Sequence, residues 1–289
     1  MAHQTPKLAG VMGWPIGHSL SPHLHRFWLD RHGLAGDYVP LMVRPQNLAS
    51  AIRGLYPLGF SGVNITVPHK EAAMALVDRV DPLARRIGAI NCISIDAKGR
   101  LEGRNTDAYG FFAHLEASAP NWQAKGARAL VLGAGGAARA IIAALLDAGL
   151  EQVFVVNRTG DRARALADDL ACSYGDHRVR AQPWQDRTML LKEVSLLVNS
   201  TVLGMVGQPS LSIELSLMAQ GSVVYDIVYK PLLTPLLKEA EARRLVAVDG
   251  LGMLIHQAVP AFHSFFGVRP EADDDVRSAL LKALESSGS

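Results

Sequence analysis

The chain has 289 residues, which is long enough for two domains with a sizeable core. Hydrophobic residues make up 49% and charged residues 19%, as in an ordinary globular protein, and the formal net charge of +2 gives no argument for nucleic acid or an anionic membrane as a partner. The only cysteines are Cys92 and Cys172, and the first residues lack the apolar segment of a signal peptide. We therefore expect a cytoplasmic protein without disulfides.

The first hundred residues alternate between predicted strands and helices, which indicates an α/β layer structure. Strands are predicted over residues 7–13, 38–43, 62–67, 89–95 and 101–105, and helices over residues 23–31, 46–55 and from Glu71 onward.

The segment over residues 61–70 alternates apolar and polar side chains, as in a strand with two different faces. Asn64 and Thr66 share the polar face, and Pro68 cannot donate to a ladder, so pairing should end before Lys70. Because ligands bind at the carboxyl ends of strands in α/β folds, these polar residues are candidate ligand contacts. The alternative is that Asn64 and Thr66 face water at a sheet edge and that Lys70 is an ordinary surface lysine.

A second alternating series follows the predicted helix over residues 106–117 and the polar stretch 120–126, which is a candidate linker. Strands are predicted over residues 128–132, 152–157, 196–199, 223–226 and 245–249, and helices over residues 137–148, 161–170, 252–266 and 273–284. The sequence thus predicts two α/β domains, the second of Rossmann type, with C-terminal helices that return to the first. The predicted boundaries are 1–106 with 251–289 for the first domain and 107–250 for the second.

The sequence from Arg128 to Ile142 reads as a strand, a glycine-rich turn and an amphipathic helix. Gly133, Gly135 and Ala138 match the pattern G-x-G-x-x-G/A. The first glycine permits the tight turn, the second lets a pyrophosphate approach the backbone, and the small third residue packs the helix on the strand. The helix N-terminus offers unpaired N–H groups to the phosphates, so we predict a dinucleotide cofactor.

The end of the next predicted strand distinguishes between NAD and NADP. NAD-specific sites carry an acidic residue there for the ribose 2′-hydroxyl, whereas this strand ends in Asn157, Arg158 and Thr159. A carboxylate would repel a 2′-phosphate, and a guanidinium can bind it through two hydrogen bonds, so the sequence favours NADP. The alternative is that Arg158 only belongs to a solvated helix start.

Two serines lie in the turn after the first strand. Ser21 precedes Pro22, so it could serve only as a helix N-cap, while Ser19 has no such role.

Further candidates follow other predicted strands. Asp107 could cap its helix, or it could form an acid/base pair with Lys70. Asn91 is an amide in an apolar strand, and Gln257 is either a satisfied core amide or a ligand contact.

Seven ordered motifs together resemble the shikimate dehydrogenase family and cover nearly the whole chain. They are Gly17-His-Ser19-Leu-Ser21-Pro, Gly62-Val-Asn64-Ile-Thr66-Val-Pro-His-Lys70, Gly88-Ala-Ile-Asn91, Asn105-Thr-Asp107, Gly133-Ala-Gly135-Gly136-Ala-Ala, Asn157-Arg158-Thr159 and Gly250-Leu-Gly-Met253-Leu-Ile-His-Gln257. The resemblance implies an enzyme that uses NADP, and no metal, for the reversible reduction of 3-dehydroshikimate to shikimate in chorismate and aromatic amino-acid biosynthesis. The first domain would bind this substrate, the second NADP, and the enzyme would be a monomer or a homodimer.

The resemblance also implies roles for individual residues. It makes Lys70 and Asp107 the catalytic pair. The residues that it places around the substrate are Ser19, Ser21, Asn64, Thr66, Asn91, Tyr229 and Gln257. Those that it assigns to the cofactor are Gly133, Ala134, Gly135, Gly136, Ala137, Asn157, Arg158, Thr159, Arg162, Thr201, Ile227, Gly250 and Met253.

The sequence departs from the family pattern at two places. Cys92 stands where the family usually has threonine, and His25 and Arg26 occupy a helix start where it often has His-Asn. Two other functions stay open. One is the same chemistry on quinate or an amino analogue of shikimate, since one pocket contact can decide between them. The other is a non-catalytic NADP-binding sensor, against which the presence of both Lys70 and Asp107 argues.

Overall fold

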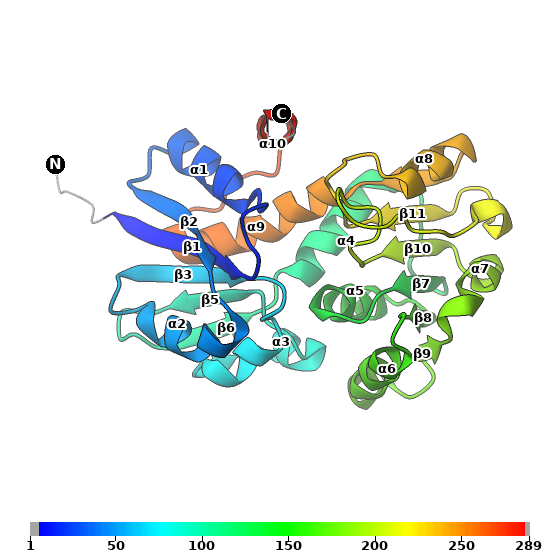
Figure 1. Ribbon diagram of the computed structural model, residues 1–289, viewed down its shortest axis with the longest axis horizontal. Helices are drawn as coiled ribbons and strands as arrows, with labels where there is room; N and C mark the ends of the chain where they lie inside the picture. The colour runs from blue at the N-terminus through cyan, green and yellow to red at the C-terminus, as the bar shows by residue number, and fades with distance from the viewer. Residues whose placement is uncertain (1–5, 287–289) are drawn as a thin grey trace. The chain divides into compact units, whose positions relative to one another are not determined.

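The computed structural model describes residues 6–286, and the chain divides into two compact units (Figure 1). The first unit consists of the residues up to Thr106 and those from Leu254 onward, and the second is Asp107–Met253. The fold class predicted from the sequence, two α/β domains with C-terminal helices that return to the first, is confirmed. The stretch 120–126 lies inside the second unit and does not separate the two. In the described part of the chain, no helix is long and apolar enough to cross a bilayer.

The first unit is built on a mixed six-stranded sheet in the order β2-β1-β3-β5-β6-β4. β1 runs parallel to β2 and β3, whereas β5 is antiparallel to both β3 and β6. The strands are β1 (Lys7–Gly13), β2 (Gly36–Met42), β3 (Phe60–Ile65), β4 (Arg79–Val80), β5 (Cys92–Ile95) and β6 (Leu101–Arg104). The helices are α1 (Ser21–Arg31), α2 (Leu48–Gly54), α3 (Pro82–Ile87), most of α9 (Gly250–Phe266) and α10 (Asp274–Ser286), with 3-10 turns η1 (Pro45–Asn47) and η2 (Ala72–Leu76).

β3 lies inside the sheet, between β1 and β5, so the edge-strand alternative for its polar face is wrong. Val63 and Ile65 are buried in a hydrophobic cluster with α2, as the alternating pattern predicts. Gly62 lies beneath Phe265 of α9, because a Cβ there would come within 2.4 Å of that ring. Asn64 is buried as well, although nothing in the alternating pattern predicts an amide in the interior.

An aromatic cluster joins α1, β2 and α9 in the first unit. The His25 ring stacks on Tyr38 with a centroid distance of 3.8 Å and also lies near Trp28, Phe262 and Phe265. The imidazole is fully buried and has no hydrogen-bond partner among the described residues. Burial lowers the pKa of His25 to about 3, so the ring is neutral in the folded protein.

Arg26, the second residue of the His25-Arg26 pair that departs from the family pattern, lies on the surface. Arg26 is exposed and pairs with Asp37 of β2, with Nε 2.7 Å from Oδ1. Of these two adjacent residues, therefore, only His25 belongs to the core.

The second unit holds a fully parallel six-stranded sheet in the order β12-β11-β10-β7-β8-β9, which is the doubly wound Rossmann order. The strands are β7 (Arg128–Leu132), β8 (Gln152–Val156), β9 (Val179–Gln182), β10 (Leu196–Asn199), β11 (Val223–Asp226) and β12 (Val246–Val248). The helices are α4 (Asp107–Ser118), α5 (Gly136–Asp147), α6 (Gly160–Tyr174), α7 (Arg187–Leu190) and α8 (Pro235–Ala242), with 3-10 turns η3 (Trp184–Asp186), η4 (Leu191–Glu193) and η5 (Leu215–Leu217).

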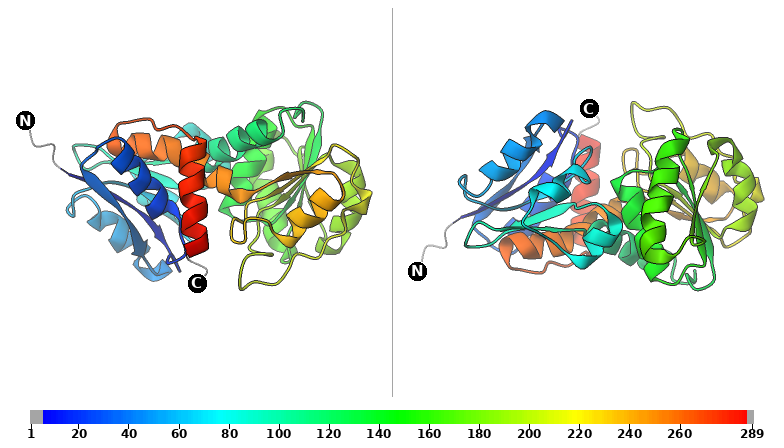
Figure 2. Two further views of the ribbon diagram at one scale, coloured as in Figure 1. Left: turned by 90° about the horizontal axis from the view of Figure 1, so that it is seen from above. Right: turned by 90° about the horizontal axis from the view of Figure 1, so that it is seen from below.

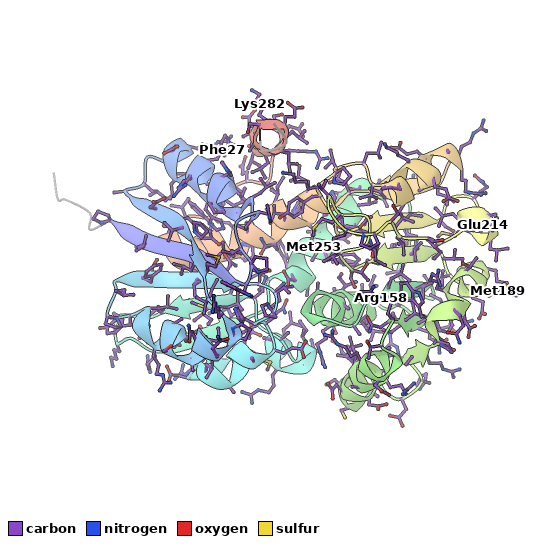
Figure 3. All side chains as sticks on the ribbon, viewed as in Figure 1. Phe27, Arg158, Met189, Glu214, Met253 and Lys282 are labelled. Carbon is purple, nitrogen blue, oxygen red and sulfur yellow. The ribbon has the colours of Figure 1, made fainter. Side chains whose placement is uncertain are left out.

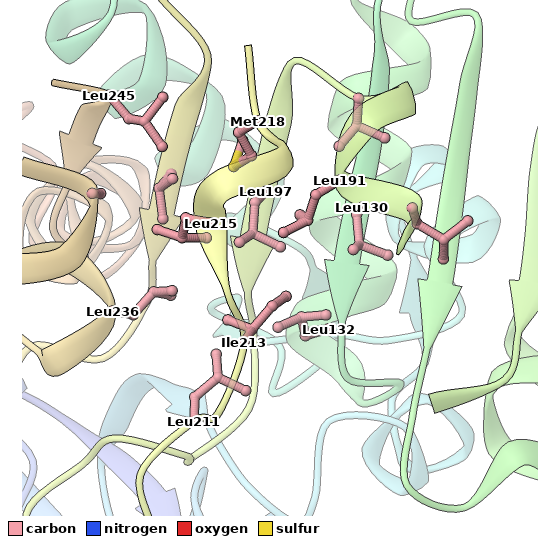
Figure 4. Close-up of a cluster of buried hydrophobic side chains, with 14 of the residues drawn as sticks. Leu130, Leu132, Leu191, Leu197, Leu211, Ile213, Leu215, Met218, Leu236 and Leu245 are labelled. Atoms are coloured by element: carbon pink, nitrogen blue, oxygen red, sulfur yellow. The ribbon is translucent and has the colours of Figure 1, made fainter. Parts of the chain in front are cut away.

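Helices cover both faces of this sheet (Figure 2), so its strands are apolar on both sides. On one face, Leu130 and Leu132 of β7 pack with Leu197 of β10 in a cluster that also includes Leu215 and Leu236 (Figure 4). The chain order reverses between β7 and β10. Ligands bind at such a switch point, beyond the carboxyl ends of the strands.

A buried carboxylate connects the ends of β10 and β11. Asp226 accepts hydrogen bonds from Asn199 Nδ2 at 2.9 Å, from the N–H of Val228 at 3.0 Å and from the hydroxyl of Thr234 at 2.8 Å. Despite these donors, burial raises the pKa of Asp226 to about 6. Because Nδ2 of Asn199 faces the Asp226 carboxylate, Oδ1 of Asn199 points the other way. This oxygen accepts hydrogen bonds from the N–H and the hydroxyl of Thr201.

The structure corrects several predicted elements. β3 ends at Ile65, two residues earlier than predicted, and Val67 is exposed. The predicted α-helix from Glu71 is only the 3-10 turn η2, because the extended residue Val77 ends it after five residues. The elements absent from the prediction are β4, β9, α3, α7 and α8, which are short or lack a regular apolar period.

We predict that His25→Phe makes the protein less sensitive to acid. Below about pH 6.5 the unfolded chain binds a proton at His25 that the folded state does not, so stability is lost as the pH falls. Phenylalanine cannot take up that proton. At about 1.4 kcal/mol per pH unit, the variant should lose about 2 kcal/mol less free energy of unfolding than the wild type between about pH 7 and pH 5.

Urea unfolding followed by tryptophan fluorescence at the two pH values measures this difference. His23→Phe changes an exposed histidine of the same helix and should keep the wild-type pH dependence. Equal losses in His25→Phe and the wild type would show that His25 is not the acid-sensitive group.

Candidate substrate and cofactor sites

A cluster of amide and hydroxyl groups lies in the first unit, where three chain segments meet. Asn91 Oδ1 accepts from the N–H of Thr106 at 2.7 Å, and its Nδ2 donates to Thr106 Oγ1 at 3.0 Å and to Gln257 Oε1 at 3.3 Å. Gln257 Nε2 in turn donates to the carbonyl of Leu254 at 3.0 Å. Because a backbone N–H can only donate, it fixes which way the Asn91 amide faces.

Asn64 and the two serines lie on neighbouring segments of the same unit. Asn64 Nδ2 donates to the carbonyl of Asn91 at 3.1 Å, and its Oδ1 accepts from the Tyr38 phenol at 2.8 Å. Ser19 Oγ accepts from the N–H of Ser21 at 3.3 Å. The N-cap alternative for Ser21 is wrong, because Leu20 takes the cap position and no side chain caps α1.

Thr66 and Lys70 lie in the turn after β3 of the first unit, whereas Asp107 is the first residue of the second unit. Thr66 is half-buried, and its N–H donates to the carbonyl of Met12 at 2.9 Å. Lys70 is also half-buried, and its carbonyl accepts from the N–H of Ile90 at 2.9 Å, which ties its turn to the residue before Asn91. Asp107 is buried, follows Thr106 directly and is the first residue of α4.

The glycine loop of the second unit has the geometry that the motif predicts. Gly133 has a φ of +110°, and a Cβ there would lie 2.6 Å from Ser200 Oγ, so this position requires glycine. A Cβ on Gly135 would meet nothing within 4 Å, so its backbone is open to a ligand. Ala138 is fully buried where α5 packs on the sheet. The remaining loop residues differ in exposure, since Ala134 is buried and Gly136 and Ala137 are half-buried.

Two cavities of the second unit share Asn157, Arg158 and Trp184, and the smaller one is also lined by this loop. The one of about 180 Å³ is lined by Gly133, Ala134, Gly135, Asn157, Arg158, Arg162, Trp184, Ser200, Thr201, Val202 and Leu203. The one of about 270 Å³ is lined by Asn157, Arg158, Gly160, Arg164, Ala181, Gln182, Pro183, Trp184 and Gln185. The strand ends of β7, β8 and β10 thus contribute to one hollow, as the switch-point rule predicts.

The charge of these cavities suits a phosphorylated ribose. Arg158, labelled in Figure 3, is exposed and has no ion-pair partner among the described residues, whereas Arg164 pairs with Asp161. Among the described residues that line either cavity, none is acidic. The arrangement therefore fits NADP, since an unpaired guanidinium can bind a 2′-phosphate and no carboxylate opposes it.

Other predicted cofactor and substrate residues lie outside these two cavities. Thr159 is exposed, and Ile227 and Tyr229 are half-buried after β11. Gly250 packs against the backbone of Ile227, where a Cβ would come 2.2 Å from the carbonyl oxygen. Met253, labelled in Figure 3, is buried at the last position of the unit.

Several residues at these places were not predicted as site residues, among them Thr106, Trp184 and Arg164. Thr106 lies inside one of the seven motifs, between Asn105 and Asp107, so its position could have suggested it. Trp184 and Arg164 line a cavity, but Trp184 follows β9, a strand that the sequence pattern does not reveal. Arg187 holds Trp184 in place, with its guanidinium 4.8 Å from the ring centroid.

Comparison with known proteins gives one consistent result. The family described as "Shikimate dehydrogenase substrate binding domain" matches residues 11–93, and "Shikimate / quinate 5-dehydrogenase" matches residues 115–261. A protein of Paramagnetospirillum magneticum named shikimate dehydrogenase (NADP(+)) is 52% identical over 275 residues, which are 95% of this chain and 98% of that protein.

Two solved structures show the same fold. The Thermus thermophilus shikimate 5-dehydrogenase, in complex with NADP(H) and shikimate, is 39% identical with a TM-score of 0.82, over 97% of this chain and 99% of that one. The Corynebacterium glutamicum quinate dehydrogenase, in complex with NAD, is 33% identical with a TM-score of 0.88, over 96% and 99% of the two chains. The resemblance read from the seven motifs is confirmed, and the chain belongs to the shikimate dehydrogenase family.

Proposed function

We propose that this chain catalyses the NADP-dependent, reversible reduction of 3-dehydroshikimate to shikimate. The main observation behind the proposal is the cavity that is lined by the glycine loop, Arg158 and Thr201. None of the described residues that line this cavity is acidic. The names of the relatives at about half identity agree with it. We also propose that the first unit binds the substrate and the second binds NADP.

The chemistry requires a hydride carrier and a group that moves a proton. NADP, when bound, supplies the hydride transfer. Loss of hydride from the carbinol carbon of shikimate requires loss of the hydroxyl proton, for which we assign Lys70. We assign Asp107 to the orientation of Lys70 and the substrate hydroxyl. The substrate hydroxyls and carboxylate would contact the amides and serines of the first unit.

Quinate is the strongest alternative substrate, because a quinate dehydrogenase shares the fold over nearly the whole chain. Quinate carries one more hydroxyl than shikimate, so a single pocket contact can decide between them. An amino analogue of shikimate is a second alternative, and a non-catalytic NADP sensor a third. Since Lys70 and Asp107 are both present, the chain has the groups that turnover needs. We further propose a cytoplasmic monomer or homodimer, in keeping with two cysteines that form no disulfide among the described residues.

The decisive assay offers the purified protein NADP and then NAD with shikimate and with quinate. We expect the largest kcat/KM for shikimate with NADP. A larger kcat/KM for quinate would identify the alternative substrate. No oxidation of either substrate, together with measurable NADP binding, would support the sensor.

We predict that Arg158→Asp weakens NADP binding much more than NAD binding. The variant loses a charged hydrogen bond of about 1.5–3 kcal/mol to the 2′-phosphate and adds a repelling carboxylate. Equilibrium dissociation constants for the two cofactors measure the effect. Arg180→Gln, an exposed arginine of β9 outside both cofactor cavities, should leave both constants unchanged. Equal weakening of NADP and NAD would remove Arg158 from the 2′-phosphate site.

We predict that Lys70→Ala lowers kcat by about 10²–10⁴-fold, the usual contribution of general acid–base catalysis. NADP affinity should stay close to that of the wild type, because the glycine loop belongs to the other unit. Steady-state kinetics and NADP titration together test both statements, with Lys98→Ala, an exposed lysine of the same unit, as the control. A raised KM with near-normal kcat would make Lys70 a binding residue only.

A further inference from the structure

A buried carboxylate and a buried amide face each other where β10 and β11 end. Asn199 and Asp226 are the paired last residues of these two strands, and both are fully buried. Asn199 Nδ2 donates to Asp226 Oδ1 at 2.9 Å. Neither residue is a predicted site residue, although both lie at the carboxyl edge of the Rossmann sheet, where ligands bind.

The carboxylate of Asp226 is held from its other side as well. Its Oδ1 also accepts from the N–H of Val228 at 3.0 Å, and its Oδ2 accepts from the hydroxyl of Thr234 at 2.8 Å. Thr234 is itself fully buried and caps α8, since its oxygen accepts from the N–H of Leu237 at 3.3 Å. The carboxylate is therefore an acceptor in a fixed place opposite Asn199.

The amide of Asn199 has only one orientation that satisfies its neighbours. Nδ2 faces two groups that accept, the Asp226 carboxylate and the carbonyl of Leu203 at 3.0 Å. Oδ1 faces the N–H of Thr201 at 3.1 Å, which can only donate, and the Thr201 hydroxyl at 2.7 Å. A rotated amide would set acceptor against acceptor and donor against donor. Asp226 therefore fixes the acceptor that Asn199 offers to Thr201.

The segment 200–203, which follows Asn199, forms one wall of the smaller cofactor cavity. Thr201 Oγ1 accepts from the N–H of Leu203 at 3.1 Å, so the segment is also bonded within itself. It lies directly against the glycine loop, since a Cβ on Gly133 would come 2.6 Å from Ser200 Oγ and 3.2 Å from Thr201 Cγ2. A small shift of the segment would therefore change the space between it and the loop.

We propose that Asp226 is a positioning residue of the cofactor site, which acts through Asn199 to hold the segment 200–203 against the glycine loop. The inference rests on the proposed function. Asp226 lines neither cofactor cavity, so it acts only through the residues that it holds. Because the glycine loop faces the pyrophosphate that NADP and NAD share, the effect should be equal for both cofactors, unlike that of Arg158.

The test is Asp226→Leu, which replaces the carboxylate with an apolar side chain of similar size. Asn199 then loses the acceptor that fixes its amide, and Thr201 loses a fixed partner. We expect the dissociation constants of NADP and NAD, measured by isothermal titration calorimetry, to rise by the same factor of about threefold to tenfold, the range of one neutral hydrogen bond. Asp226→Asn keeps an oxygen that can accept from Asn199 and should bind both cofactors nearly as the wild type does.

Asn199→Ala tests the route from Asp226 to the segment. It removes the amide and leaves the two other donors of Asp226 in place, so it should raise both dissociation constants even if Asp226→Leu folds poorly. In the Asn199→Ala background, Asp226→Leu should have little further effect, since the group that Asp226 positions is gone. Unchanged constants in Asn199→Ala, or an equal rise from Asp226→Leu with and without Asn199, would overturn the inference while leaving the proposed function intact.

Tyr225→Phe is a matched control for the loss of a buried polar contact in β11. The Tyr225 hydroxyl lies 2.8 Å from His114 Nδ1, and adjacent residues of a strand point to opposite faces of the sheet. This variant should lower thermal stability and leave both dissociation constants unchanged. A rise in both constants here would assign the effect to lost stability and overturn the inference. A wild type that binds no NADP would instead refute the proposed function, and with it this role.

Discussion

The side-chain amide of Asn91 holds together the polar half of the first unit. It bonds to the backbone N–H of Thr106, just after β6, and to Gln257 of α9, while the backbone carbonyl of Asn91 accepts from Asn64 on β3. The unit is discontinuous in sequence, and the bond to Gln257 joins segments 166 residues apart. A buried amide that has all its hydrogen-bond partners is held in one orientation. An unpaired polar group in the interior would cost about 1–3 kcal/mol. The same bonds that close the fold therefore also fix the donors and acceptors that a substrate would meet.

The elements that could be predicted from the sequence are those with a local cause. β1, β7, β10 and β11 begin and end where the apolar runs predict, and the glycine loop adopts the turn that its motif requires. β9, which continues the Rossmann sheet, has only four residues, and just one of them is buried. Its place comes from pairing with β8, which no local pattern encodes.

For the candidate site, the sequence predicts which residues take part but not which of them bond to each other. The motifs select Asn91 and Gln257, but not that they bond to each other across 166 positions of sequence. They pass over Tyr38 because a tyrosine in a strand usually indicates packing alone. Ser21 was open to the simpler role of an N-cap, and the structure excludes that role because Leu20 takes the cap position. Orientation of a side-chain amide depends on such long-range neighbours, so the sequence can identify the residue without its hydrogen-bonding sense.

Asp226 gives the second unit a response to acid opposite to that of the first. Its carboxyl holds a proton up to about pH 6 in the folded state, whereas the unfolded chain releases it near pH 3.8. Lowering the pH through this interval therefore favours the folded second unit, because the folded state binds more protons there. In the same interval the buried imidazole of His25 favours unfolding of the first unit. Mild acid should accordingly lower the stability of the mixed sheet's unit relative to that of the parallel sheet's unit.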